Sequence, residues 1–178
     1  TLTITKDGGK WFACFSFDLE VPDEPKRDIL KAVGIDLGLI DLYYSSDGTH
    51  KEVPRYFRKQ EKRLRVLQRR ISKEPKRTDR YFKLLAAIQK VHAKIRNQRH
   101  DFLHKRANEL LESADLIVHE DLNIAGMKRR PRPVQDDNGD YLPNGASRKT
   151  GLNKSISDAG WGMFLDILKY KAVGSGKT

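Results

Sequence analysis

The chain has 178 residues, of which 38% are hydrophobic and 33% charged, and it carries a formal net charge of +11. It is long enough to bury a core of its own. It has no signal peptide and no apolar run near the roughly 18 residues of a membrane span, so we expect a cytoplasmic protein without a membrane partner. The single cysteine, Cys14, excludes an internal disulfide and a cysteine-based zinc site, and the positive charge indicates a polyanionic partner.

The first elements are two predicted strands. Residues 1–5 and 10–20 alternate in polarity around the turn Lys6-Asp7-Gly8-Gly9, which predicts a β-hairpin. The acidic, proline-bearing stretch 21–28 is typical of a linker. We therefore place a domain boundary there and assign residues 1–28 to a neighbouring module. Since the sequence begins inside a strand without methionine and ends after a helix, we expect it to be part of a longer protein.

The segment from residue 31 to residue 53 predicts three strands. Val33-Gly34-Ile35 is a buried strand that ends at Asp36, residues 42–44 form the next, and the turn at 46–48 leads into a third at 49–53. Two helices follow, at about 55–72 and 78–112, where apolar residues recur near a period of 3.6. Together they form a helical hairpin, and residues 115–119 then form a fourth strand that ends at Glu120.

The remaining residues contain few apolar positions until the last helix. Residues 126–153 are polar and rich in proline and glycine, which predicts a long mobile loop of a kind that often has a function. The pattern of Ile156, Trp161, Phe164, Leu165 and Leu168 predicts an amphipathic helix at about 155–172.

Two carboxylates, Asp36 and Glu120, each end an apolar strand. Strands that lie side by side would present both at one rim of the sheet, where they could bind a divalent cation pair. Oxygen ligands favour Mg²⁺ or Mn²⁺ over zinc, and two ions roughly 3.5–4 Å apart activate water and stabilise the leaving oxygen of a phosphate ester. Taken singly, Asp36 could be a turn residue and Glu120 could belong to a cap, but their shared position favours the metal site.

The positive charge is concentrated in the predicted helical hairpin. Residues 54–106 hold 19 lysines and arginines against 4 acidic residues, whereas the rest of the chain holds 16 against 20. A solvated helix face normally alternates in sign, and an anionic membrane would need a broad apolar face. Contact with a nucleic-acid backbone is therefore favoured, through contacts that fix position rather than sequence. The predicted binding residues are Arg55, Arg58, Lys62, Arg63, Arg69, Arg70, Arg77, Arg80, Arg96 and Arg99.

Seven motifs span most of residues 32–172, at 34–39, 47–48, 67–70, 92–95, 97–105, 120–123 and 157–162. In their order and spacing they resemble the transposon-associated TnpB (OrfB) proteins, and less closely the type V CRISPR effectors. The resemblance implies a RuvC-like nuclease domain of RNase H-like α/β fold at 29–178, incomplete at its C-terminus and preceded by the last hairpin of a β-barrel wedge domain.

That resemblance also implies a function. The family consists of Mg²⁺-dependent, RNA-guided DNA endonucleases, so the expected partners are a guide RNA and a target DNA held by shape and backbone. Asp36 and Glu120 match the first two of three metal-binding carboxylates. The helical hairpin matches an insertion beside the guide–target duplex, and residues 126–153 match a lid over the active site.

The sequence departs from the family pattern after residue 172. The family continues into a zinc ribbon and a third catalytic aspartate, neither of which lies in these 178 residues, and Asp158 is no substitute because the family has it in addition. Zinc is therefore expected only in the ribbon. Two alternatives remain open: a nucleic-acid-binding fragment or degenerate relative that does not cut, and an unguided junction resolvase of the same fold.

Overall fold

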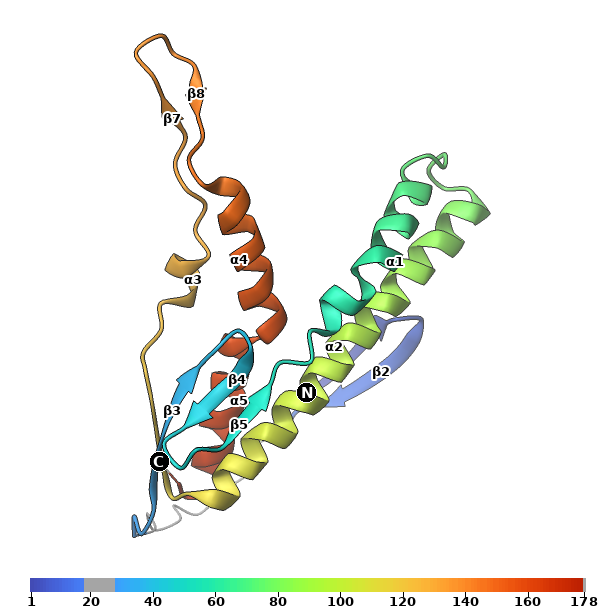
Figure 1. Ribbon diagram of the computed structural model, residues 1–178. Coiled ribbons are helices and arrows are strands. Elements are labelled where there is room, and N and C mark those ends of the chain that lie inside the picture. The colour runs from blue at the N-terminus through green and yellow to red at the C-terminus, as the bar shows by residue number, and fades with distance from the viewer. Residues whose placement is uncertain (18–27, 178) are drawn as a thin grey trace. The chain divides into compact units, whose positions relative to one another are not determined.

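The computed structural model describes residues 1–17 and 28–177 (Figure 1). The chain forms two compact units, one from Thr1–Lys26 and Arg55–Phe102 and the other from Arg27–Pro54 and Leu103–Thr178. Most of the predicted linker at 21–28 lies outside the described residues, so the domain boundary placed there stays a prediction.

The first unit contains the predicted β-hairpin. Strands β1 (Leu2–Asp7) and β2 (Lys10–Phe15) pair antiparallel, with Leu2 opposite Phe15. The turn between them has positive φ at Gly8 and Gly9, which glycine adopts without strain. Asp7 forms an ion pair with Arg96 of α2, so the hairpin tip is joined to that helix.

The helical hairpin consists of α1 (Tyr56–Ile71) and α2 (Asp79–Ser113), close to the predicted bounds. In the first unit its core is formed by Leu64, Val91 and Ile95. The α2 helix begins after Thr78, whose hydroxyl oxygen accepts a hydrogen bond of 3.2 Å from the backbone of Tyr81. Residues 79–102 of α2 belong to the first unit and its remainder to the second.

The second unit is built on a mixed four-stranded sheet, as the α/β prediction requires. Its strands lie in the order β5-β4-β3-β6. They are β3 (Ala32–Leu37), β4 (Asp41–Ser45), β5 (His50–Glu52) and β6 (Leu116–His119). β3 is antiparallel to β4 and parallel to β6, so the ends of β3 and β6 meet at the same edge of the sheet.

One face of this sheet is buried. Val33, Ile35 and Leu37 point into the core, whereas Asp36 between them is exposed. Helix α5 (Trp161–Gly174) covers the buried face (Figure 1). There the ring of Phe164 stacks on that of Tyr43, with 5.8 Å between the ring centroids. Because a strand alternates its side chains between faces, this burial fixes which residues are presented on the open face.

The segment from residue 124 to residue 160 differs from the prediction. The loop predicted at 126–153 overlaps the end of α3 (Ile124–Met127) and contains β7 (Val134–Gln135) and β8 (Tyr141–Leu142). Its last residues, 146–153, are helical and form the first half of α4 (Ala146–Ala159). The last helix is also two helices rather than one, because α4 ends at Gly160, where φ is 76°. A left-handed glycine ends a helix readily, so α5 starts in a new direction.

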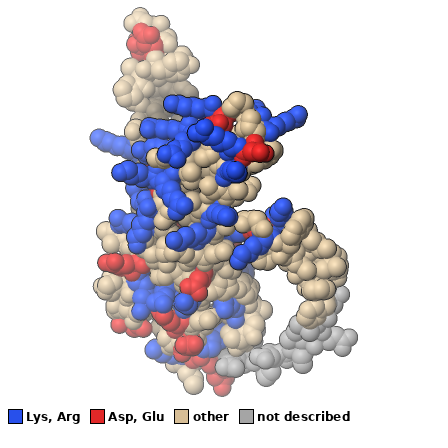
Figure 2. All heavy atoms as spheres, turned by 90° about the vertical axis from the view of Figure 1, so that its right-hand side faces the viewer, with Lys and Arg blue, Asp and Glu red and all other residues tan. Residues whose placement is uncertain are grey.

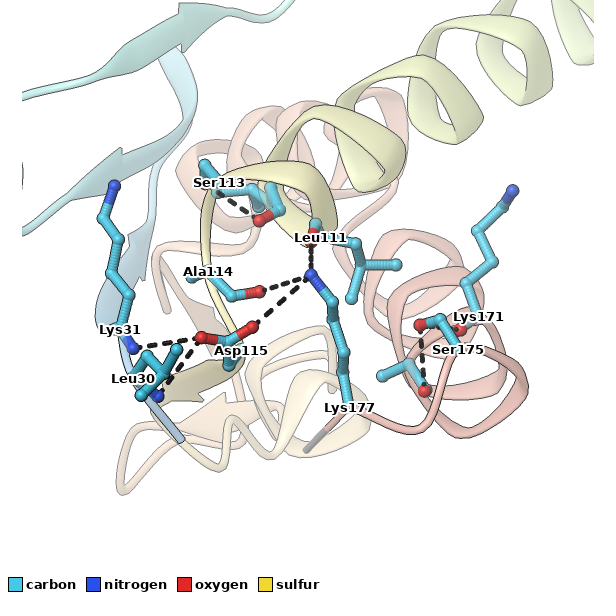
Figure 3. Close-up of polar contacts among 11 residues, drawn as sticks. Leu30, Lys31, Leu111, Ser113, Ala114, Asp115, Lys171, Ser175 and Lys177 are labelled. Atoms are coloured by element: carbon cyan, nitrogen blue, oxygen red, sulfur yellow. Dashed lines mark hydrogen bonds and ion pairs between the residues drawn. The ribbon is translucent and has the colours of Figure 1, made fainter. Parts of the chain in front are cut away.

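A lysine near the C-terminus joins distant parts of the second unit (Figure 3). Lys177 donates hydrogen bonds to the carbonyl oxygens of Leu111 and Ala114 at the end of α2, and its ammonium group is 3.8 Å from Asp115. The other carboxylate oxygen of Asp115 accepts from the backbone of Lys31 at 3.1 Å. The end of α2 and the approach to β3 are thereby tied together.

Candidate functional site

Asp36 and Glu120 lie on the open face of the sheet and line the same hollow. Ile35 of β3 pairs with His119 of β6 in parallel register, so Asp36 and Glu120 each follow a paired residue. Both carboxylates are exposed. The hollow has a volume of about 660 Å³ and is lined by Gly34, Ile35, Asp36, Tyr44, Ser45, Ser46, Val118, His119 and Glu120.

Hydrogen bonds fix the backbone around this hollow. Gly34 donates its N–H to the hydroxyl oxygen of Ser46 at 3.1 Å, and its carbonyl accepts from the Ser46 N–H at 2.8 Å. On β6, the ring Nδ1 of His119 lies 2.9 Å from the backbone oxygen of Glu120. Most residues that line the hollow therefore belong to strands or to backbone held by them, which makes the site rigid.

The end of β3 is anchored from the opposite face. The indole Nε1 of Trp161 donates a hydrogen bond of 2.8 Å to the carbonyl oxygen of Gly38. Gly38 also passes so close to the next strand that a Cβ there would lie 2.7 Å from the backbone oxygen of Asp41. The position two residues after Asp36 thus requires glycine and is held by the first residue of α5.

The carboxylate pair fits a hard divalent cation in its donor chemistry. Two carboxylate groups at an open rim supply oxygen ligands and leave room for water and phosphate oxygens, the coordination that Mg²⁺ prefers. Among the described residues, however, no group of three or more histidine, cysteine, aspartate or glutamate side chains lies close enough together to hold a metal. Asp158 on α4 is buried, with 5% of its surface exposed.

The sequence did not single out Tyr44, His50 or Asp41 as site residues. Tyr44 is the cross-strand partner of Asp36 and of His50, so Asp36, Tyr44 and His50 lie in one line across β3, β4 and β5. The Tyr44 ring is parallel to that of His50 at 5.1 Å, and His50 Nδ1 lies 3.3 Å from a carboxylate oxygen of Asp41. In the sequence, Tyr44 is marked only by its place next to Tyr43 in a strand, where neighbouring side chains point to opposite faces.

Lysine and arginine side chains crowd the helical hairpin of the first unit (Figure 2). Nine of the ten predicted nucleic-acid-binding residues are exposed, and Arg99 is partly buried. Arg80 forms an ion pair with Glu74 at 3.0 Å, and Arg96 forms the ion pair with Asp7. Binding of nucleic acid by all ten residues stays a prediction.

Comparison with known proteins identifies the family. The model of the OrfB_IS605 family, described as a probable transposase, matches residues 16–131. The chain therefore belongs to the OrfB_IS605 family, and the TnpB (OrfB) resemblance of its motifs is confirmed.

Two curated relatives carry more specific names. A protein of Escherichia coli K12 named "Putative RNA-guided DNA endonuclease InsQ" is 33% identical over 175 residues, which are 98% of this chain and 42% of the relative. A Streptomyces pristinaespiralis protein named "Putative RNA-guided DNA endonuclease" is 30% identical over 178 residues, 99% of this chain and 39% of the relative. The chain thus spans about two fifths of their length. None of the helices in the described residues has the length and apolar character to cross a membrane.

Proposed function

We propose that this chain contributes the RuvC-like, DNA-cleaving centre of a transposon-encoded RNA-guided endonuclease. The observation that carries the proposal is the position of Asp36 and Glu120, which follow paired residues on adjacent parallel strands and line one open hollow. Membership of the OrfB_IS605 family and the names of the two relatives support it.

The proposed chemistry is hydrolysis of a phosphodiester bond. Asp36 and Glu120 would hold Mg²⁺ or Mn²⁺, which when bound supplies an activated water and neutralises charge on the phosphate. The two side chains are exposed, so a DNA strand can reach them from the open face, while α5 closes the other face of the sheet. The strands keep both carboxylates in place before substrate binds, which reduces the entropy lost on the way to the transition state.

The proposed partners are a guide RNA and its DNA target. The exposed arginines and lysines of α1 and α2 would contact the phosphate backbone, as their density of positive charge favours. Base pairing with the guide would read the sequence. In this proposal, residues 126–153 correspond to the lid, and zinc binds only in a ribbon beyond these residues.

The test separates metal binding from cleavage. Mn²⁺ binding measured by electron paramagnetic resonance and Mg²⁺-dependent cutting of DNA should both be lost in Asp36→Asn and Glu120→Gln. Asp121→Asn is the matched control, because Asp121 is also exposed but lines a different hollow beside α5. Equal Mn²⁺ binding in all four proteins would refute the metal site.

A second candidate function is nucleic-acid binding without cutting. It is favoured by the lack of a third metal ligand near the carboxylate pair among the described residues. In that case DNA binding would persist, and neither the wild-type chain nor any variant would cut DNA with Mg²⁺ or Mn²⁺.

A further inference from the structure

Tyr44 is an exposed aromatic side chain that lines the hollow containing the carboxylates. It is 55% exposed, as is Val118 on the same hollow. Its neighbour Tyr43, which points to the other face of the sheet, is 1% exposed. An aromatic ring of this size left half open on a sheet face is available for contact with a ligand.

The ring of Tyr44 is held in place from one side. His50 stacks on it with an angle of 4° between the ring planes, and Asp41 in turn holds the His50 ring through its Nδ1. Because Asp36, Tyr44 and His50 lie on successive strands, the ring face away from His50 is on the side of Asp36. The open ring face is therefore directed toward the carboxylates.

The sheet surface beside the Tyr44 ring is open because Gly34 has no side chain. Gly34 lies two residues before Asp36 on the same face of β3, and a Cβ placed on it would meet no atom within 4 Å. The strand backbone would tolerate a side chain at that position. Because position 34 has no side chain, the space between Tyr44 and Val118 stays open.

We propose that Tyr44, supported by His50, is a stacking platform for a base of an unpaired DNA strand. The phosphate next to that base would lie beside the divalent cation that Asp36 and Glu120 would hold, because the carboxylates alone would repel it. This inference rests on the proposed function and adds a binding residue to the same site. Aromatic rings bind unpaired bases by stacking with little dependence on sequence, which suits an enzyme whose sequence choice is made by a guide.

The test is photochemical labelling of the wild-type chain by single-stranded DNA that contains 5-iodouracil. Light of long wavelength couples this base to an aromatic ring against which it stacks. We expect the label within the tryptic peptide 32–51, on Tyr44 rather than on the buried Tyr43. Tandem mass spectrometry distinguishes the two tyrosines.

Four variants complete the experiment. Tyr44→Phe should keep the label, whereas Tyr44→Leu should lose it and weaken single-strand binding at this site by about ten-fold or more. Gly34→Leu should fold normally yet lose the label, because its side chain fills the hollow. The control is Tyr170→Leu, since Tyr170 on α5 is equally exposed, at 55%, and also contacts a histidine, His104.

The outcomes separate this inference from the proposed function. Metal-dependent cutting without label on Tyr44, or equal labelling of Tyr44→Leu at another residue, overturns the platform and leaves the nuclease. Label on Tyr44 in a chain that never cuts supports the platform and overturns the nuclease for this chain. Label by RNA alone, or no label and no cutting, overturns the platform as proposed.

Discussion

The indole nitrogen of Trp161, the first residue of α5, donates a hydrogen bond to the carbonyl oxygen of Gly38, two residues after Asp36. This bond passes from the buried layer of the second unit to the edge of the sheet where the carboxylates lie. The position of Asp36 is thus controlled by a helix on the opposite face.

Replacement of Trp161 by phenylalanine should therefore affect both stability and the site. The carbonyl of Gly38 loses its donor, so we expect the free energy of unfolding to fall by about 1 kcal/mol. Denaturant titration measures that loss, and Mn²⁺ affinity should fall with it if the site loosens. Trp11→Phe is the control, because Trp11 is 69% exposed on β2. Equal losses in the two variants would contradict a specific role for the Trp161 bond.

Charge reversal on α1 should change the salt dependence of DNA binding. Arg63 and Arg70 are exposed on a helix with few acidic residues. If each contacts one phosphate, Arg63→Glu and Arg70→Glu should each reduce the slope of log K against log salt by about 1. Fluorescence anisotropy at several salt concentrations gives the slope.

The control for that experiment is Lys169→Glu, which makes the same change of charge at an exposed position on α5. A slope that changes equally in Lys169→Glu and the two α1 variants would indicate a general charge effect. In that case α1 would have no special place in the interface.

The stability of the second unit should depend on pH through Tyr43. Burial, reinforced by the nearby Glu109, raises the pKa of Tyr43 to about 12. The folded chain therefore holds this proton more tightly than the unfolded chain does, and the stabilisation is complete below about pH 10 and lost as pH rises through 12. By pH 12 the wild type should lose about 2 kcal/mol more than Tyr43→Phe. Parallel curves of unfolding free energy against pH for the two proteins would contradict this.

Removal of the Lys177 ammonium should destabilise the end of α2. In Lys177→Met the carbonyl oxygens of Leu111 and Ala114 lose a shared donor, which we expect to cost about 1–3 kcal/mol. Lys169→Met, at an exposed position, should have almost no effect. Thermal unfolding compares the two, and a melting temperature unchanged in Lys177→Met would mean that water replaces the lysine.

The parts of the fold with strong periodicity were predictable from the sequence. The strands around Val33 and Leu42 and both helices of the hairpin were located within a few residues, because burial of one face imposes a period of 2 or 3.6. β6 ends at His119, directly before Glu120 as predicted, whereas β3 continues one residue past Asp36 to Leu37.

The segment after Glu120 was less predictable, since local turn chemistry decides its structure. The β7–β8 hairpin turns at Asn138 and Gly139, a sequence that favours such turns, and the side chain of Asp136 accepts hydrogen bonds from Asn138 and Asp140. This signal was outweighed by the prolines and glycines around it. The break at Gly160 was hidden because apolar positions continue on both sides of it.

The position of Tyr44 opposite Asp36 could not be derived from either strand alone. It depends on the tight turn at residues 38–41 and on the irregular pairing of β4 with β5 between Asp41 and Tyr44. Register is a property of the assembled sheet, so one residue more in the turn would have placed Tyr44 in the core.

The parallel pairing of β3 with β6 has a consequence for how the chain folds. The hydrogen bond from Lys31 to Asp115 beside it spans 84 positions, and the whole helical hairpin lies between. Contacts so distant in sequence form slowly, because the entropy of closing the loop is lost before they stabilise anything. The helices can form early from local contacts, whereas Asp36 and Glu120 come together only in the last steps. Under the proposed function, a nascent or partly folded chain would therefore bind nucleic acid before its cleavage site is assembled.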